Sequence, residues 1–94
     1  MKSKEIKSKQ FVVYIHYESS GLVRYIGQGV PDRAYNHNCR KNKKHVSWMR
    51  KMNASGVEYV SICARGLTKS QALQLESQLL DVHRNIPNKL FNLA

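Results

Sequence analysis

Two short runs of β-forming residues, joined by a polar link, constrain the fold of this chain more than any other feature. Residues 11–17 and residues 22–26 are both rich in Val, Ile and Tyr. The link, residues 18–21, is polar and ends in glycine. Such runs with such a link are typical of a β-hairpin. We therefore expect two antiparallel strands near the start of the fold.

A four-residue loop would fix the register of this hairpin. In that register Tyr17 faces Leu22, and Tyr14 faces Tyr25. Directly opposed residues in an antiparallel pair point to the same side of the sheet. Two phenol rings would then stand side by side, with Gly27 leaving open backbone beside them. The hairpin alone fits an aromatic packing pair as well as a functional site.

Charge is the strongest global property of the sequence. The 94 residues include 16 Lys and Arg against six Asp and Glu, which gives a formal net charge of +10. Such a potential indicates a polyanionic partner, with nucleic acid ahead of a membrane. No apolar run approaches the length of a membrane span, and the first ten residues lack the apolar region of a secretory signal. We therefore expect a cytoplasmic, DNA-binding protein with no membrane association.

The length is that of one small domain, which we place at residues 11–94 after a flexible basic arm at residues 1–10. A first helix is predicted at about residues 32–40, where it would put Arg33 and His37 on one face. A weak helical stripe follows in residues 40–52, then a β-branched run at residues 57–64. A last helix begins with the capping-box pair Thr68 and Gln71. The pattern predicts an α+β fold of order β-β-α-α-β-α, with a small three-stranded antiparallel sheet flanked by helices.

Basic residues are densest in residues 40–51, around Trp48. Dense positive charge of this kind favours contact with nucleic-acid phosphates. The residues that we predict to contact nucleic acid are Arg40, Lys41, Lys43, Lys44, His45, Arg50 and Lys51.

The last helix carries a carboxylate in an unexpected place. At about 100° per residue, Glu76 falls among Ala72, Leu73, Leu79 and Leu80 on the apolar side. A carboxylate facing a core is costly unless a cation or strong hydrogen bonds satisfy it. Two explanations stay open, which are an ion pair to an Arg or Lys at the edge of the core and a Mg²⁺ site.

A set of separated residues follows one order along the chain and resembles the GIY-YIG nuclease family, in the form of a stand-alone phage or mobile-element domain. Val12 stands where the family usually has glycine, and Gln28 stands where some members carry lysine. The resemblance spans about residues 11–92. The residues that carry it are Tyr14, the triplet Tyr25-Ile26-Gly27, Arg33, His37, Glu76 and Asn92.

The resemblance implies a metal-dependent endonuclease that hydrolyses DNA phosphodiester bonds, with one Mg²⁺ or Mn²⁺ held by Glu76. Tyr14 would help to activate water, and Tyr25 would orient and polarise the site. Arg33 would stabilise charge on the phosphate, and His37 would assist proton transfer or contact phosphate. Gly27 would belong to the site backbone, and Asn92 would brace the site or contact substrate.

Other functions remain open. The chain could be a non-catalytic nucleic-acid-binding module that keeps the nuclease fold. A zinc or HNH-like site built from His37, Cys39 and His45 matches no common zinc spacing. Because we see no separate recognition domain, the chain could act as a free-standing nuclease or rely on dimerisation or a partner, and its DNA specificity stays open.

Overall fold

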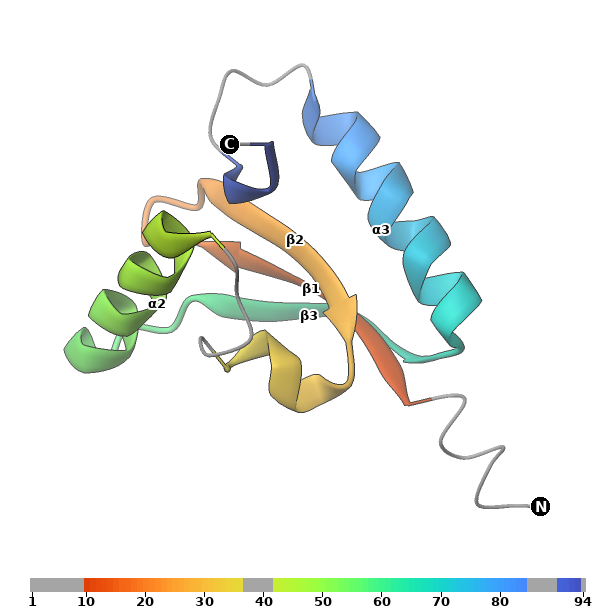
Figure 1. The fold of residues 1–94 in the computed structure, drawn as a ribbon, viewed down its shortest axis with the longest axis horizontal. Coiled ribbons are helices and arrows are strands. Elements are labelled where there is room, and N and C mark those ends of the chain that lie inside the picture. The colour runs from red at the N-terminus through yellow and green to blue at the C-terminus, as the bar shows by residue number, and fades with distance from the viewer. Residues whose placement is uncertain (1–9, 37–41, 85–89, 94) are drawn as a thin grey trace.

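The computed structural model describes residues 10–36, 42–84 and 90–93. It combines a three-stranded antiparallel sheet with helices, which confirms the predicted α+β class (Figure 1). In chain order, the elements are β1 (Phe11–Tyr17), β2 (Val23–Gly29), the 3₁₀ helix η1 (Pro31–Ala34), α2 (Lys43–Ser55), β3 (Val60–Leu67), α3 (Lys69–Arg84) and the 3₁₀ helix η3 (Phe91–Leu93).

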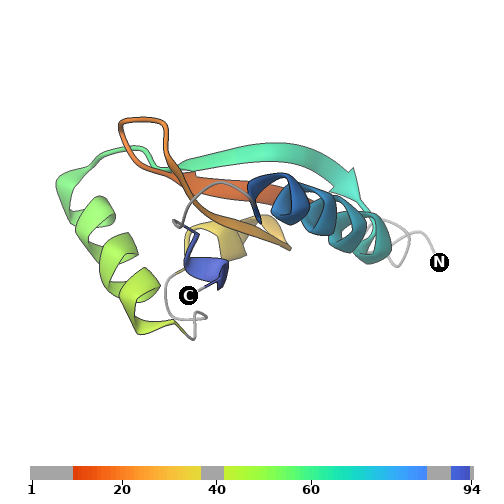
Figure 2. The same cartoon turned by 90° about the horizontal axis from the view of Figure 1, so that it is seen from above.

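The central strand of the sheet is β1, with β2 on one side and β3 on the other. Val12 and Tyr14 point to one face of β1, where they pack with Met49 of α2, Ala34 of η1 and Val60 of β3. In Figure 1, η1 and α3 lie on opposite sides of the sheet. Figure 2 shows α2 and α3 at opposite ends of it. The strand pair β1–β2 therefore has η1, α2 and α3 around it, which come from different parts of the chain.

The hairpin forms as predicted, but its register differs by two residues. Tyr14 pairs with Gly27, and Tyr25 pairs with His16. The predicted pairing of Tyr14 with Tyr25 is therefore wrong. Because the difference is an even number of residues, both tyrosines still point to the same face of the sheet.

Two local features account for the change of register. The Glu18 N–H donates to the Leu22 carbonyl at 2.9 Å, which leaves a three-residue loop instead of four. Gly21 completes this loop with a φ of +94°, a conformation that favours glycine. With this loop, Tyr17 faces Val23 and not Leu22. A bulge between His16 and Tyr17 then moves the pairing by one further residue, so that His16 faces Tyr25.

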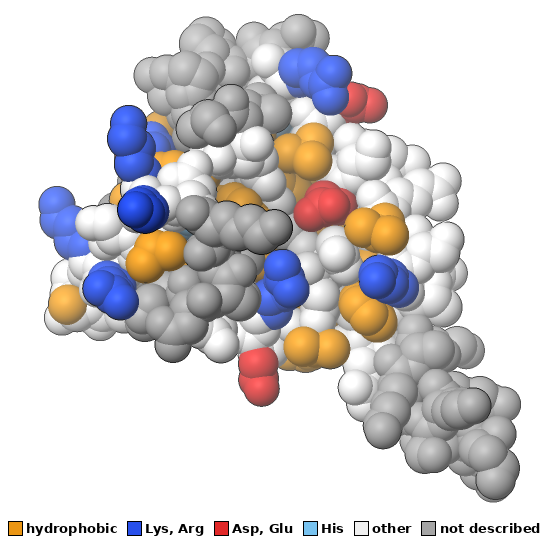
Figure 3. All heavy atoms as spheres, in the orientation of Figure 1, with side chains coloured by type: hydrophobic (Ala, Val, Ile, Leu, Met, Phe, Trp, Pro, Cys, Tyr) orange, Lys and Arg blue, Asp and Glu red, His pale blue; other side chains and the backbone are white. Residues whose placement is uncertain are grey.

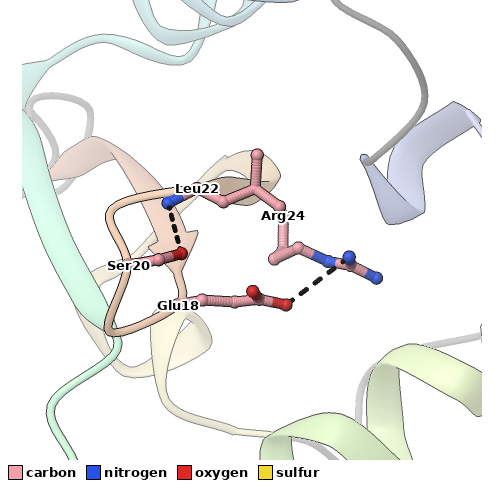
Figure 4. A network of polar contacts seen from close by, with 4 residues as sticks. All are labelled: Glu18, Ser20, Leu22 and Arg24. Atoms are coloured by element: carbon pink, nitrogen blue, oxygen red, sulfur yellow. Dashed lines mark hydrogen bonds and ion pairs between the residues drawn. The ribbon is translucent and has the colours of Figure 1, made fainter.

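Polar contacts tie the loop to the start of β2 (Figure 4). Ser20 Oγ accepts a hydrogen bond from the Leu22 N–H at 3.4 Å. Arg24 forms an ion pair with Glu18 at 3.5 Å. The Arg24 guanidinium also lies 4.5 Å from the centre of the Phe91 ring, a cation–π contact that joins β2 to η3.

The first predicted helix is much shorter than expected. It is the four-residue 3₁₀ helix η1, in which the Arg33 N–H donates to the Val30 carbonyl at 3.0 Å. In a continuing α-helix the Ala34 carbonyl would accept a bond from residue 38. Here that carbonyl is bonded to His16 Nε2 at 2.7 Å. The predicted helix over residues 32–40 is therefore wrong. Arg33 lies in η1, and His37, predicted to share its helical face, lies outside the described residues.

The later helices begin at capped positions, and α2 ends at Ser55, three residues beyond the predicted end at residue 52. In the box before α3, the Thr68 N–H donates to Gln71 Oε1 at 3.0 Å, and the Gln71 N–H donates to Thr68 Oγ1 at 3.2 Å. Asn42 caps α2 through the Lys44 and His45 N–H groups. The third strand begins later than predicted, at Val60 and not at residue 57.

Asn92 acts as a short substitute for a fourth strand. Its Oδ1 accepts from the Ile26 N–H at 2.9 Å, and its Nδ2 donates to the Ile26 carbonyl at 2.8 Å. Since β2 is an edge strand, these two bonds satisfy backbone groups of a residue whose side chain is fully buried. Asn92 therefore lies in the bracing position that the sequence suggested.

We expect Asn92→Ala to lower the free energy of unfolding by about 2–4 kcal/mol, because it leaves a donor and an acceptor of Ile26 without these partners. Urea denaturation measures the change. The matched control is Asn53→Ala at an exposed position of α2, which should change stability by less than about 0.5 kcal/mol. Equal stabilities for the two variants would contradict a bracing role.

Candidate functional site

The two tyrosines of the site lie over a glycine. Tyr14 is fully buried, and its ring centre is 6.2 Å from that of Tyr25. A Cβ added at Gly27 would lie 2.6 Å from Tyr14 Cζ and 2.7 Å from Tyr25 Cε2. The two rings therefore cover the backbone that the sequence suggested would be open. Only glycine leaves room for them in this arrangement.

Arg33 reaches the same strand from η1. Its Cδ lies 2.6 Å from the position that a Cβ on Gly29 would take. Gly29 has a φ of +150°, so its conformation and the closeness of Arg33 both favour glycine at the end of β2. The stem of Arg33 thus rests on the edge strand that also carries Tyr25 and Gly27.

Glu76 lies half-buried on α3. Burial raises the pKa of its carboxyl group above the ordinary value, and the nearby positive charge of Arg33 partly opposes this. Among the described residues, ion pairs within 4 Å join Glu18 to Arg24 and Asp81 to Arg84, and neither includes Glu76. The positive charge of Arg33, on η1, therefore acts on the Glu76 carboxyl group, on α3.

A cation at Glu76 would need oxygen ligands from elsewhere. In the part of the chain that the structure describes, no three His, Cys, Asp or Glu side chains come together to hold a metal ion. Mg²⁺ commonly binds through one or two carboxylates and completes its shell with water and substrate phosphate. The carboxylate of Glu76 fits that mode of binding, and it fits Mn²⁺ for the same reason.

The basic residues of α2 divide between surface and core. Lys43, Lys44, Arg50 and Lys51 are exposed, and Lys and Arg side chains gather over α2 in Figure 3. His45 is 1% exposed, so its predicted place in the nucleic-acid-contacting surface is wrong. The helical period explains this, because position 45 lies one turn before the buried Met49. Arg40 and Lys41 lie outside the described residues.

The sequence interpretation missed a buried histidine pair. His16 is fully buried, and its Nδ1 lies 2.9 Å from Nε2 of His45. His16 follows Tyr14 by two residues on β1, so the strand period already placed it on the face of the tyrosines. Nothing local indicated that His45 would meet it from α2. The zinc alternative also fails to gain support, because His45 is engaged with His16, and His37 and Cys39 lie outside the described residues.

No protein-family model matches this chain, and no curated protein or solved structure does so. The resemblance to GIY-YIG nucleases therefore stays a prediction from the residue pattern. Over the described residues, the helices are all too short or too polar to cross a bilayer.

The half-buried carboxylate leads to a prediction about pH. Because the pKa of Glu76 is raised in the folded protein, folding favours the protonated form, and stability is lost as pH rises through that raised pKa. Glu76→Gln should therefore be as stable as the parent, or slightly more stable, at pH 7. The difference should shrink toward pH 4, below the raised pKa, where the carboxyl of the folded parent is already protonated.

Chemical denaturation at the two pH values measures this difference. Glu58→Gln, at an exposed position just before β3, is the matched control and should leave stability unchanged at both. A loss of about 3 kcal/mol at pH 7 for Glu76→Gln would instead show that the carboxylate is a structural partner of a buried cation.

Proposed function

We propose that this protein is a metal-dependent endonuclease that hydrolyses DNA phosphodiester bonds, with a catalytic domain similar to the GIY-YIG nucleases. The observation that carries the proposal is the approach of Arg33 to Glu76. These residues come from η1 and α3, yet the charge of one changes the pKa of the other. A guanidinium that stabilises charge on a phosphate and a carboxylate that holds a metal ion would need to lie near one another in this way.

Each residue of the site has a distinct role in this reaction. Glu76 would hold Mg²⁺ or Mn²⁺, which when bound supplies Lewis-acid stabilisation of charge on the phosphate. Tyr14 would help to deprotonate the attacking water, and Tyr25 would orient and polarise it. Arg33 would stabilise the charge that develops on the phosphate oxygens. His37 would assist proton transfer or contact the phosphate.

The surroundings of Tyr14 support its role. A phenol has an ordinary pKa of about 10 and is a weak base at neutral pH. Positive charge from Arg33 and from a bound cation would favour the phenolate. Gly27 supports the site by allowing the Tyr14 ring to lie directly on the backbone of β2.

A non-catalytic nucleic-acid-binding module is the alternative. It would use the same basic surface but would not need Glu76. A half-buried carboxylate whose pKa is raised by burial destabilises the fold at neutral pH. A protein that only binds DNA would not need such a carboxylate. This observation favours the enzyme.

Binding to DNA should depend strongly on salt. The exposed basic residues of α2 would contact phosphates, so the logarithm of affinity should fall linearly with the logarithm of salt concentration. In Lys43→Gln/Lys44→Gln, the slope should become smaller by about one for each lost contact. Fluorescence anisotropy at several salt concentrations measures this. Lys51→Gln and Lys69→Gln compare the far end of α2 with the exposed start of α3, and only the former should change the slope.

The activity itself is tested by incubation with supercoiled plasmid. Nicked or linear products should form with Mg²⁺ or Mn²⁺ and should be absent with EDTA. Binding without any cleavage in both metals would favour the non-catalytic module.

A further inference from the structure

We propose that the buried pair His16–His45 positions Arg33, and so serves cleavage without touching DNA. This proposal rests on the proposed endonuclease function. It is carried by two short hydrogen bonds that join three elements, from His45 on α2 through His16 on β1 to the Ala34 carbonyl on η1. Ala34 directly follows Arg33.

The donor and acceptor of each of these two hydrogen bonds follow from the Ala34 carbonyl. The Ala34 carbonyl can only accept, so the nitrogen that faces it at 2.7 Å, Nε2 of His16, must carry a hydrogen. In a neutral ring Nδ1 of His16 then accepts, and Nε2 of His45 donates to it across 2.9 Å. The tautomers of both rings are thus fixed by a backbone oxygen.

The bond to Ala34 ties the end of η1 to β1. It uses the carbonyl that follows those of Asp32 and Arg33, which accept the last backbone bonds of the turn, and Ala34 is fully buried. The turn is closed by backbone bonds from the N–H groups of Arg33, Tyr35 and Asn36 to the carbonyls three residues before each, and the Arg33 stem leaves it across Gly29. The direction in which Arg33 leaves η1 is therefore set by His16.

The aromatic surroundings hold the pair rigidly. The His16 ring centre lies 5.2 Å from that of Tyr14 and 5.5 Å from that of Tyr25. The His45 ring stacks on Phe91 at 4.8 Å with an interplanar angle of 19°. Because these contacts confine both rings, the groups that hydrogen-bond to them are held in place as well.

Two substitutions separate the two bonds of His16. A glutamine amide can place its nitrogen near the position of Nε2 and still donate to Ala34. An asparagine amide reaches only about as far as Nδ1, so it can meet His45 but not Ala34. Under the proposal, His16→Gln should keep kcat within about threefold of the parent, and His16→Asn should lower kcat by about 30- to 100-fold. In both, KM for DNA should change by less than about twofold.

A purely structural role for His16 predicts a different result. The two variants would then lose activity in proportion to their lost stability, and His16→Gln would be no more active than His16→Asn. Equal kcat in the two variants, or a lower kcat in His16→Gln, overturns the proposal.

A second experiment asks whether His16 acts through Arg33. In an Arg33→Ala background, single-turnover cleavage should fall by no more than about twofold when His16→Asn is added, because the positioned side chain is already absent. Losses that multiply across the two sites overturn the proposal.

Nuclear magnetic resonance tests the pair without using activity, so a failure of the proposed function would not hide the result. In the folded parent, long-range ¹H–¹⁵N spectra should show the His16 hydrogen on Nε2. The Arg33 Nε–H signal should move in His16→Asn and stay in place in His16→Gln. A His16 hydrogen on Nδ1 alone, or an Arg33 Nε–H signal at the parent position in both variants, overturns the proposal even if the protein cuts no DNA.

Discussion

Glu76→Gln should abolish Mg²⁺-dependent cleavage of DNA while the variant remains folded and still binds DNA. The glutamine keeps the size and the half-buried position of the side chain but removes the negative charge that would hold the cation. Since the pKa of Glu76 is raised by burial, loss of the charge should not destabilise the fold at neutral pH. Loss of cleavage without loss of stability separates a metal ligand from a structural anion.

Thermal unfolding adds a second measurement of the same change. A metal ion that binds only the folded state raises the melting temperature. We expect Mg²⁺ or Mn²⁺ to raise that of the parent and of the Glu58→Gln control, and to leave that of Glu76→Gln unchanged. If Glu76→Gln is folded and cuts DNA at the rate of the parent, Glu76 has no part in the mechanism.

Tyr14→Phe should lower the rate of cleavage by about a hundredfold or more while folding and DNA binding persist. The substitution keeps the buried ring that packs on Gly27 and deletes only the hydroxyl. Single-turnover rates at saturating DNA give the effect on the chemical step directly.

Tyr59→Phe is the matched control for Tyr14→Phe. Tyr59 is 4% exposed and belongs to the same buried cluster, but it comes from the segment before β3 and has no proposed role in catalysis. It should cut DNA at close to the rate of the parent. Parent-like cleavage by Tyr14→Phe would leave the tyrosines as an aromatic packing pair.

Features encoded by neighbouring residues were predicted correctly. The hairpin follows from two β-branched runs and a glycine-terminated link, and the start of α3 follows from Thr68 and Gln71 three positions apart. The unusual place of Glu76 follows from the helical period of its own element, and the structure finds it half-buried on α3. Each of these depends on a window of a few residues.

Features set by distant contacts were not predictable in this way. The end of η1 is bonded to His16, which donates to the Ala34 carbonyl from β1. The burial of His45 depends on the same residue. The hairpin register depends on a bulge that the residue pattern does not mark. The effect of the Arg33 charge on Glu76 joins η1 to α3, and no local pattern links these two elements.

The most direct test of the proposed function compares the parent with Glu76→Gln, purified in parallel, on supercoiled plasmid with Mg²⁺ and with EDTA. The parallel preparation matters because a contaminating nuclease would appear in both samples. We expect nicked or linear DNA only for the parent with Mg²⁺. Cleavage by both proteins, or by neither with Mg²⁺ or Mn²⁺, would contradict it.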